Sequence, residues 1–169
     1  MVAFLTRMPA GIPGEVTRGN GLAVIEPQIL TPNGTTGAPT AYGVPMIIDA
    51  TAGNVGNMRT MTAGDAAPYG VLVRPFPTAS SQDGLGKSTP PLSGPCDILR
   101  DGYVSVLLSG STAAAKGGPV YIWTAAPSGS HITGGWEASN PGGNGIAVTN
   151  AVFTGPADAN SITEIRVLL

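Results

Sequence analysis

With 169 residues and a net charge of −2, the chain is long enough for one folded domain but carries no cluster of basic residues for binding nucleic acid. Only 11% of the residues are charged and 42% are hydrophobic, which argues against a disordered chain. The single cysteine, Cys96, cannot form a disulfide within the chain, and we expect it to be a small buried residue. The composition therefore favours a weakly charged domain without a nucleic-acid or membrane partner.

Residues 1–18 carry apolar side chains that prolines and glycines separate, and they predict an extended N-terminal arm. Proline costs about 3 kcal/mol or more inside a helix, which excludes an amphipathic helix here. The apolar run is also too short for a secretory signal or a membrane span. Such an arm cannot build a core of its own, so we expect it either to become ordered on a partner or to fray as a chain end.

Short β-rich runs bounded by turn residues follow along the rest of the chain. They predict strands at 22–30, 44–50, 69–76, 102–109, 119–125 and 146–153 and at the C-terminal end. In the last of these, Ile165, Val167 and Leu169 alternate with polar residues, as in a half-buried strand. Residues 19–169 are therefore expected to form one all-β domain, a β-sandwich or jelly-roll-like fold or a barrel, with long loops at 78–95 and 126–145.

Motifs that carry chemistry are weak in this sequence. The stretch GLGKST (84–89) is similar to a phosphate-binding loop, but Ser81 replaces the first glycine, and Pro90 and Pro91 prevent the helix that this motif opens. His131 is the only histidine, and its polar, glycine-rich surroundings are typical of a solvent-exposed loop. The acidic residues are scattered, so we expect no metal site, no cofactor and no catalytic carboxylate pair.

The two tryptophans stand in different contexts. Trp123 lies within an apolar run and is expected in the core. Trp136 follows two glycines in the 126–145 loop, where it could stack on a sugar or a partner protein, or cover the end of a barrel. We favour the covering role and keep Trp136 as a candidate loop contact.

Several strings, taken together, resemble the capsid cement (decoration) proteins of tailed bacteriophages, including the Bordetella-phage type of podovirus-like virions. They are FLTRMPAGIPGEVTR (4–18), TAYGVPMIIDA (40–50), YGVLVRPFPT (69–78) and RDGYVSVLL (100–108), with KGGPVYI (116–122) further on. The resemblance covers most of the chain, although 126–145 matches no part of that pattern.

The resemblance implies a non-enzymatic virion protein, made in the bacterial host cytoplasm. It would bind the outer surface of the assembled shell of major capsid protein, often as a dimer, and help the shell withstand the packaged genome. The arm would then contact the capsid, with these expected anchors and charged contacts: Phe4, Leu5, Met8, Ile12, Arg7 and Arg18. The alternatives are a carbohydrate-binding or adhesion module that Trp136 and the 126–145 loop serve, and a hydrolase, which the shortage of titratable residues disfavours.

Overall fold

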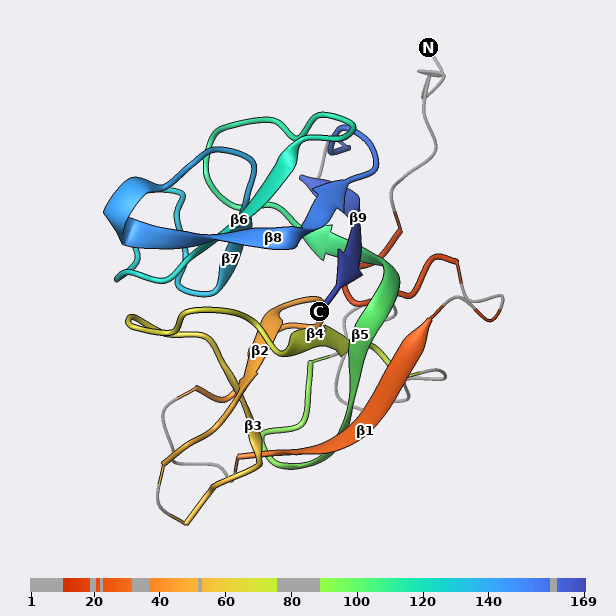
Figure 1. Ribbon diagram of the computed structural model, residues 1–169, viewed down its shortest axis with the longest axis vertical. Helices are drawn as coiled ribbons and strands as arrows, with labels where there is room; N and C mark the ends of the chain where they lie inside the picture. Colours follow the sequence, from red (N-terminus) through yellow and green to blue (C-terminus); the bar gives the residue numbers. More distant parts are fainter. Residues whose placement is uncertain are drawn as a thin grey trace.

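Figure 1 shows the computed structural model of the chain, which describes residues 11–18, 21, 23–31, 37–51, 53–75, 89–158 and 161–169. The strands are β1 (Val24–Leu30), β2 (Pro45–Ile48), β3 (Met58–Thr60), β4 (Gly70–Val73), β5 (Gly94–Leu107), β6 (Pro119–Trp123), β7 (Gly135–Glu137), β8 (Gly145–Phe153) and β9 (Ile162–Leu168). One short 3-10 helix, η1 (Gly142–Asn144), precedes β8, and the described residues include no α-helix. The predicted all-β class is confirmed.

The 14-residue strand β5 is shared by two halves of one sheet (Figure 1). The first part of β5 pairs with β1 and β4, and a closed barrel forms through β2, β3 and the bridge between Leu30 and Met58. The second part of β5 pairs with β9, and β8, β6 and β7 follow in the sheet. Trp136 of β7 then returns to a bridge with Leu108, just after β5. Of the predicted architectures, the structure therefore has the barrel, here with extra strands.

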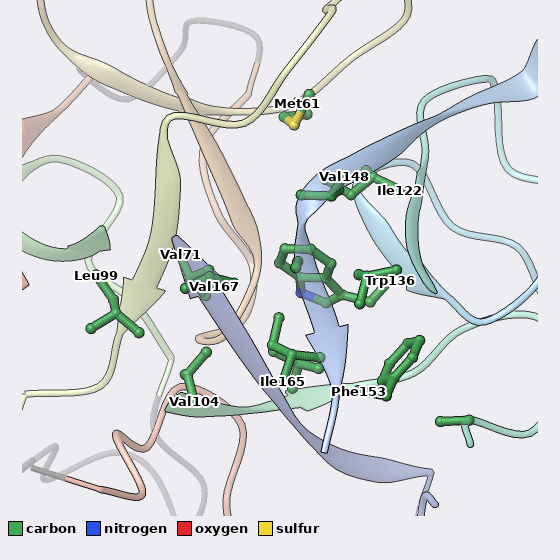
Figure 2. Close-up of a cluster of buried hydrophobic side chains, with 14 of the residues drawn as sticks. Met61, Val71, Leu99, Val104, Ile122, Trp136, Val148, Phe153, Ile165 and Val167 are labelled. Carbon is green, nitrogen blue, oxygen red and sulfur yellow. The ribbon is translucent and has the colours of Figure 1, made fainter. Parts of the chain in front are cut away.

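The buried hydrophobic side chains form two cores. The barrel core gathers Leu30, Tyr42, Met46, Met58, Leu72 and Ile98. The larger main core (Figure 2) joins β4 and β5 to the second half. On β4, Leu72 belongs to the barrel core, whereas its neighbour Val71 belongs to the main core. Both faces of β4 are thus buried, which explains why its four residues are all apolar or glycine.

The alternation that predicts the last strand is confirmed. In β9, Ile165 and Val167 are fully buried, whereas Arg166 between them is exposed. Full burial of such a side chain stabilises the fold by about 1.5–3 kcal/mol. The predicted core position of Trp123, on β6, is also confirmed.

The two predicted long loops differ from what the structure contains. The 126–145 segment includes β7 and η1, and β5 begins at Gly94, within the predicted 78–95 loop. Residues 76–88, with most of the GLGKST stretch, lie outside the described residues. The sequence also does not predict β3. Both missed strands, β3 and β7, have only three residues, too few to display an alternating pattern.

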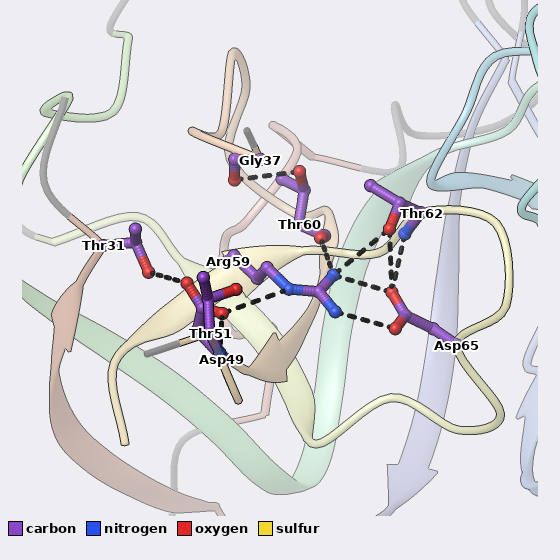
Figure 3. Close-up of polar contacts among 8 residues, drawn as sticks. All are labelled: Thr31, Gly37, Asp49, Thr51, Arg59, Thr60, Thr62 and Asp65. Carbon is purple, nitrogen blue, oxygen red and sulfur yellow. Dashed lines mark hydrogen bonds and ion pairs between the residues drawn. The ribbon is translucent and has the colours of Figure 1, made fainter. Parts of the chain in front are cut away.

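A polar network fixes the chain around the β2–β3 connection (Figure 3). The buried Asp49 carboxylate accepts hydrogen bonds from the Thr31 hydroxyl and the Thr51 N–H, both at 2.9 Å. Arg59 lies 3.7 Å from Asp49 and donates two hydrogen bonds to Asp65, at 2.7 and 2.8 Å. Burial raises the pKa of Asp49, but the hydrogen bonds from Thr51 and Thr31 and the charge of Arg59 outweigh it and lower the pKa. The charges of Asp49, Arg59 and Asp65 therefore have their partners within the fold.

Gly102 provides a test of the role of β5, because it lies where pairing passes from the barrel to the second half. Its φ is +141°, and a Cβ there would lie 3.3 Å from the Cα of Ala23. We expect Gly102→Ala to lower the free energy of unfolding by about 1–3 kcal/mol, because residues with a side chain rarely adopt this φ. Urea denaturation measures the loss. Gly143→Ala, where a Cβ meets nothing within 4 Å, is the control; equal losses in both variants would contradict the prediction.

Candidate interaction surface at the N-terminal segment

Residues 11–18, called the docked segment below, lie on the second part of β5. The N–H groups of Gly14 and Thr17 donate to the carbonyl oxygens of Ser105 and Tyr103, at 2.8 and 3.0 Å. These are antiparallel strand contacts, so β5 orders the docked segment as it orders its other neighbours.

Close backbone packing holds the docked segment against the barrel. A Cβ on Gly14 would lie 2.6 Å from the Cβ of Tyr42, and a Cβ on Gly43 would lie 2.7 Å from the nitrogen of Gly14. The Arg74 N–H, just after β4, donates to the Gly14 carbonyl at 2.8 Å. Only glycine allows the two backbones to approach this closely. Gly14 of the N-terminal sequence therefore serves packing within the domain.

Glu164 of β9 anchors the end of the docked segment. Its carboxylate accepts hydrogen bonds from the hydroxyls of Thr17 and Thr154 and from the guanidinium of Arg18, the last at 2.7 Å. Arg18 also lies over the ring of Tyr103, 4.2 Å from its centroid. Burial raises the pKa of Glu164, but the hydrogen bonds from Thr154, Thr17 and Arg18 outweigh it, so the pKa lies below its ordinary value.

These contacts correct the predicted arm of residues 1–18. Its last eight residues are ordered by their own domain, because β5 offers them a free strand edge and Glu164 a charge partner. The guanidinium of Arg18, an expected capsid contact, is bound to Glu164. Ile12 is 43% exposed and stays available to a partner. Phe4, Leu5, Arg7 and Met8 lie outside the described residues, so their roles stay predictions.

A groove of about 350 Å³ opens beside the docked segment, between the two halves of the sheet. It is lined by Pro13, by most of 37–44, by 60–62, by Leu107 and by 132–136. The described residues that line it include no Asp, Glu, Lys or Arg. Its volume lies within the usual range of about 300–1,000 Å³ for ligand pockets. We call it the junction groove; it suits an uncharged, apolar occupant.

Trp136 is not available for the loop contact for which the sequence made it a candidate. It lies in β7, is 1% exposed and donates its indole N–H to the Gly43 carbonyl at 2.6 Å. The indole packs in the main core (Figure 2) and so ties the second half to the barrel half. A buried ring has no free face for a sugar, and the carbohydrate-binding alternative therefore loses the residue on which it rested.

His131 also differs from the expected solvent-exposed loop residue. Its ring stacks on Trp123 with the centroids 4.3 Å apart, and Nδ1 lies 2.5 Å from Oε1 of Glu137. Glu137 is 1% exposed, and the Ser109 hydroxyl donates to it and to the Trp136 carbonyl. The Ser109 hydroxyl is thus occupied by a carboxylate and a backbone oxygen, and this cluster holds the 126–137 region in place.

Other reactive groups are few in the described part of the chain. Cys96 is half-buried, and burial raises the pKa of its thiol to about 11, with a smaller effect of Asp97. The thiol therefore stays protonated at neutral pH, the form that is a poor nucleophile. Among the described residues, no group of three or more His, Cys, Asp or Glu could hold a metal ion, and no helix is long and apolar enough to cross a membrane.

Comparison with known proteins defines the class, a structural protein of phage capsids. The particular family is that of the XM1 gp53 minor capsid protein, whose family model matches residues 1–167, and the chain belongs to it. A solved structure, "The capsid of Myoviridae Phage XM1", contains a similar chain with a TM-score of 0.64 and 18% identity, covering 97% of this chain and 94% of that one. None of the curated proteins matches the chain by sequence. The expected association with a phage capsid is therefore confirmed at the level of the family.

The lowered pKa of Glu164 predicts how acid affects the docked segment. A carboxylate with a depressed pKa stabilises the fold above its ordinary pKa and loses this contribution as the pH falls through the depressed value. We expect wild type to be more stable than Glu164→Gln by a constant amount above about pH 5, and the difference to shrink below it. Urea denaturation at a series of pH values measures both proteins. A difference that stays constant down to about pH 3 would contradict this linkage.

Proposed function

We propose that the protein is a cement (decoration) protein on the outer surface of the phage capsid. It binds neighbouring subunits of major capsid protein after its synthesis in the host, and it stabilises the shell against the pressure of the packaged genome. The observation that carries this proposal is the family match over residues 1–167, which includes both the domain and its N-terminal residues. The Bordetella-phage type remains part of the proposal, since the resemblance of the 40–50, 69–78 and 100–108 strings supports it.

The exposed face of β1 supports a contact between the domain and another protein. Ile25 and Ile29 are 43% and 58% exposed, and Pro27 between them is exposed as well. The alternate residues Glu26 and Gln28 are partly buried. This strand thus turns apolar side chains outward, the reverse of the usual pattern for a surface strand. A face of this kind is typical of an interaction site.

The low charge of the chain favours tight contact with a shell. A charged side chain that enters an interface must lose its hydration, and burial without a partner is costly. Only 11% of the residues carry this cost. On the adjacent strand β5, Asp97 pairs in register with Pro27 and Asp101 with Val24. The surface is therefore suited to lie against another uncharged protein surface.

Residues 1–10, called the N-terminal decapeptide below, supply the second contact. In the proposal, Phe4, Leu5 and Met8 are the apolar anchors and Arg7 a charged contact, with Ile12 at the root. A domain and a tether that touch different subunits bridge them, because the second contact forms at a high effective concentration. A protein that binds only the assembled shell stabilises that shell by about 2.7 kcal/mol per site when its free concentration is 100 times its Kd.

Removal of the N-terminal decapeptide tests the proposal. The deletion leaves the docked segment and Glu164 intact, so we expect the melting temperature of the isolated protein to stay the same. We expect affinity for purified expanded capsids that lack the protein to fall at least about tenfold, because bridging contacts are lost. Co-sedimentation with such capsids measures binding, and the release of DNA on heating measures shell stability.

A matched pair of variants separates the anchors from the length of the tether. Phe4→Ser combined with Leu5→Ser keeps the length but removes apolar anchors, and Thr6→Ser is the control. The anchor variant is expected to bind as weakly as the deletion. If the deleted protein coats capsids as wild type does, or protects them equally, the bridging role of the decapeptide is wrong.

A further inference from the structure

We propose that the junction groove binds the N-terminal decapeptide of a second copy, so that two copies pair by reciprocal exchange of these residues. The inference deepens the proposed function, on which it rests for the presence of neighbouring copies, and it names a second copy as one partner of the decapeptide. Its basis is the chemistry of the groove, the place where the described chain begins, and the exposed apolar rim.

The groove and the decapeptide match in chemistry. The floor includes Met61 and Trp136, each 1% exposed. Apart from the tyrosine hydroxyl of Tyr42, the described lining has no side chain that ionises. The decapeptide, MVAFLTRMPA, has Arg7 as its single charged side chain and several large apolar ones. Burial of a Phe, Leu or Met side chain contributes about 1.5–3 kcal/mol.

The described chain starts close to the groove. Pro13 lines the groove, and Gly11, the first described residue, is two residues away. Each decapeptide therefore joins the described chain near the rim of that copy's own groove. If two copies face each other across a two-fold axis at this rim, each decapeptide begins beside the groove of the other copy.

The rim itself calls for cover by another molecule. Leu107 and Ile132 line the groove, yet they are 45% and 48% exposed. Exposed apolar side chains that gather around a groove are typical of a protein interface. A second copy at the rim buries both side chains.

The length of the decapeptide is compatible with the neighbour's groove. Pro9 and Pro13 hold their own φ angles near −65° and push the preceding residues toward extended conformations. The eight steps between the nine residues from Leu5 to Pro13 can span up to roughly 26 Å, whereas a 350 Å³ cavity is about 9 Å across. Phe4 and Leu5 are therefore within reach of the groove of a neighbouring copy.

The size of the interface is also appropriate. The groove has 17 lining residues, and each copy would add its decapeptide of ten residues. A standard interface involves about 20–30 residues on each side. The exchange therefore supplies a complete interface without the β1 face, which stays free for the capsid.

Sedimentation velocity on the full chain tests the exchange. We expect wild type to form dimers, and Ala41→Arg to raise the dimer dissociation constant at least tenfold, because Ala41 is an exposed residue of the groove lining and an arginine there blocks it. Ala113→Arg places the same charge on an exposed alanine outside the lining and is expected to dimerise as wild type does. Equal melting temperatures of the three proteins show that each is folded.

A labelled peptide of residues 1–10 identifies the occupant. We expect it to bind, one per chain, to the protein that lacks residues 1–10, which keeps every described residue, and to lose at least tenfold in affinity with Ala41→Arg. No binding, or unchanged dimers of Ala41→Arg, overturns the inference. Peptide binding by the deleted protein with a monomeric full chain also overturns it, because the decapeptide then occupies its own groove. If capsid binding needs the decapeptide while the free protein shows neither dimers nor peptide binding, the proposed function stands and the exchange is wrong.

Discussion

The pairing of β5 with four different partners is the constraint on which the rest of the structure depends. Its first part closes the barrel with β1 and β4, and its second part carries β9 and the docked segment, with a bridge to β7 just beyond its end. The two halves share this strand, and the main core contains residues from both of them. The structure therefore does not divide between the two halves. Gly102, where the partners of β5 change, has a φ of +141°.

The pairing of β5 also changes the interpretation of the N-terminal residues. The docked segment is part of the sheet, held by hydrogen bonds to β5 and by Glu164. Only the N-terminal decapeptide remains as a candidate tether, and its root lies beside an uncharged groove. The family match supports a capsid-associated protein, and the structure has two separate apolar surfaces, the β1 face and the junction groove.

The sequence predicts those strands whose own residues show a pattern of apolar and polar side chains. The alternation in β9 and the apolar run of β6 are visible in the residues themselves, and the all-β class follows from them. The pairing of the docked segment is not visible, because its order comes from Ser105 and Tyr103, far away in the chain. Trp136 is misleading for a similar reason: the preceding glycines indicate a loop, yet Gly43 supplies the acceptor that holds its indole in the core. The uncharged groove has no signature in any single stretch, since Pro13, Met61 and Ile132 come from three of them.

The geometry of the docked segment has a mechanical consequence. A pull on the N-terminal residues that acts parallel to β5 would reach the fold through the hydrogen bonds of Gly14. The hydrogen bonds between the docked segment and β5 then resist in shear and share the load, whereas a pull across the sheet would break them one after another. The ion pair between Arg18 and Glu164, at the C-terminal end of the docked segment, is a second contact that resists such a pull. A force of this direction would therefore pass directly into β5, the longest of the described strands.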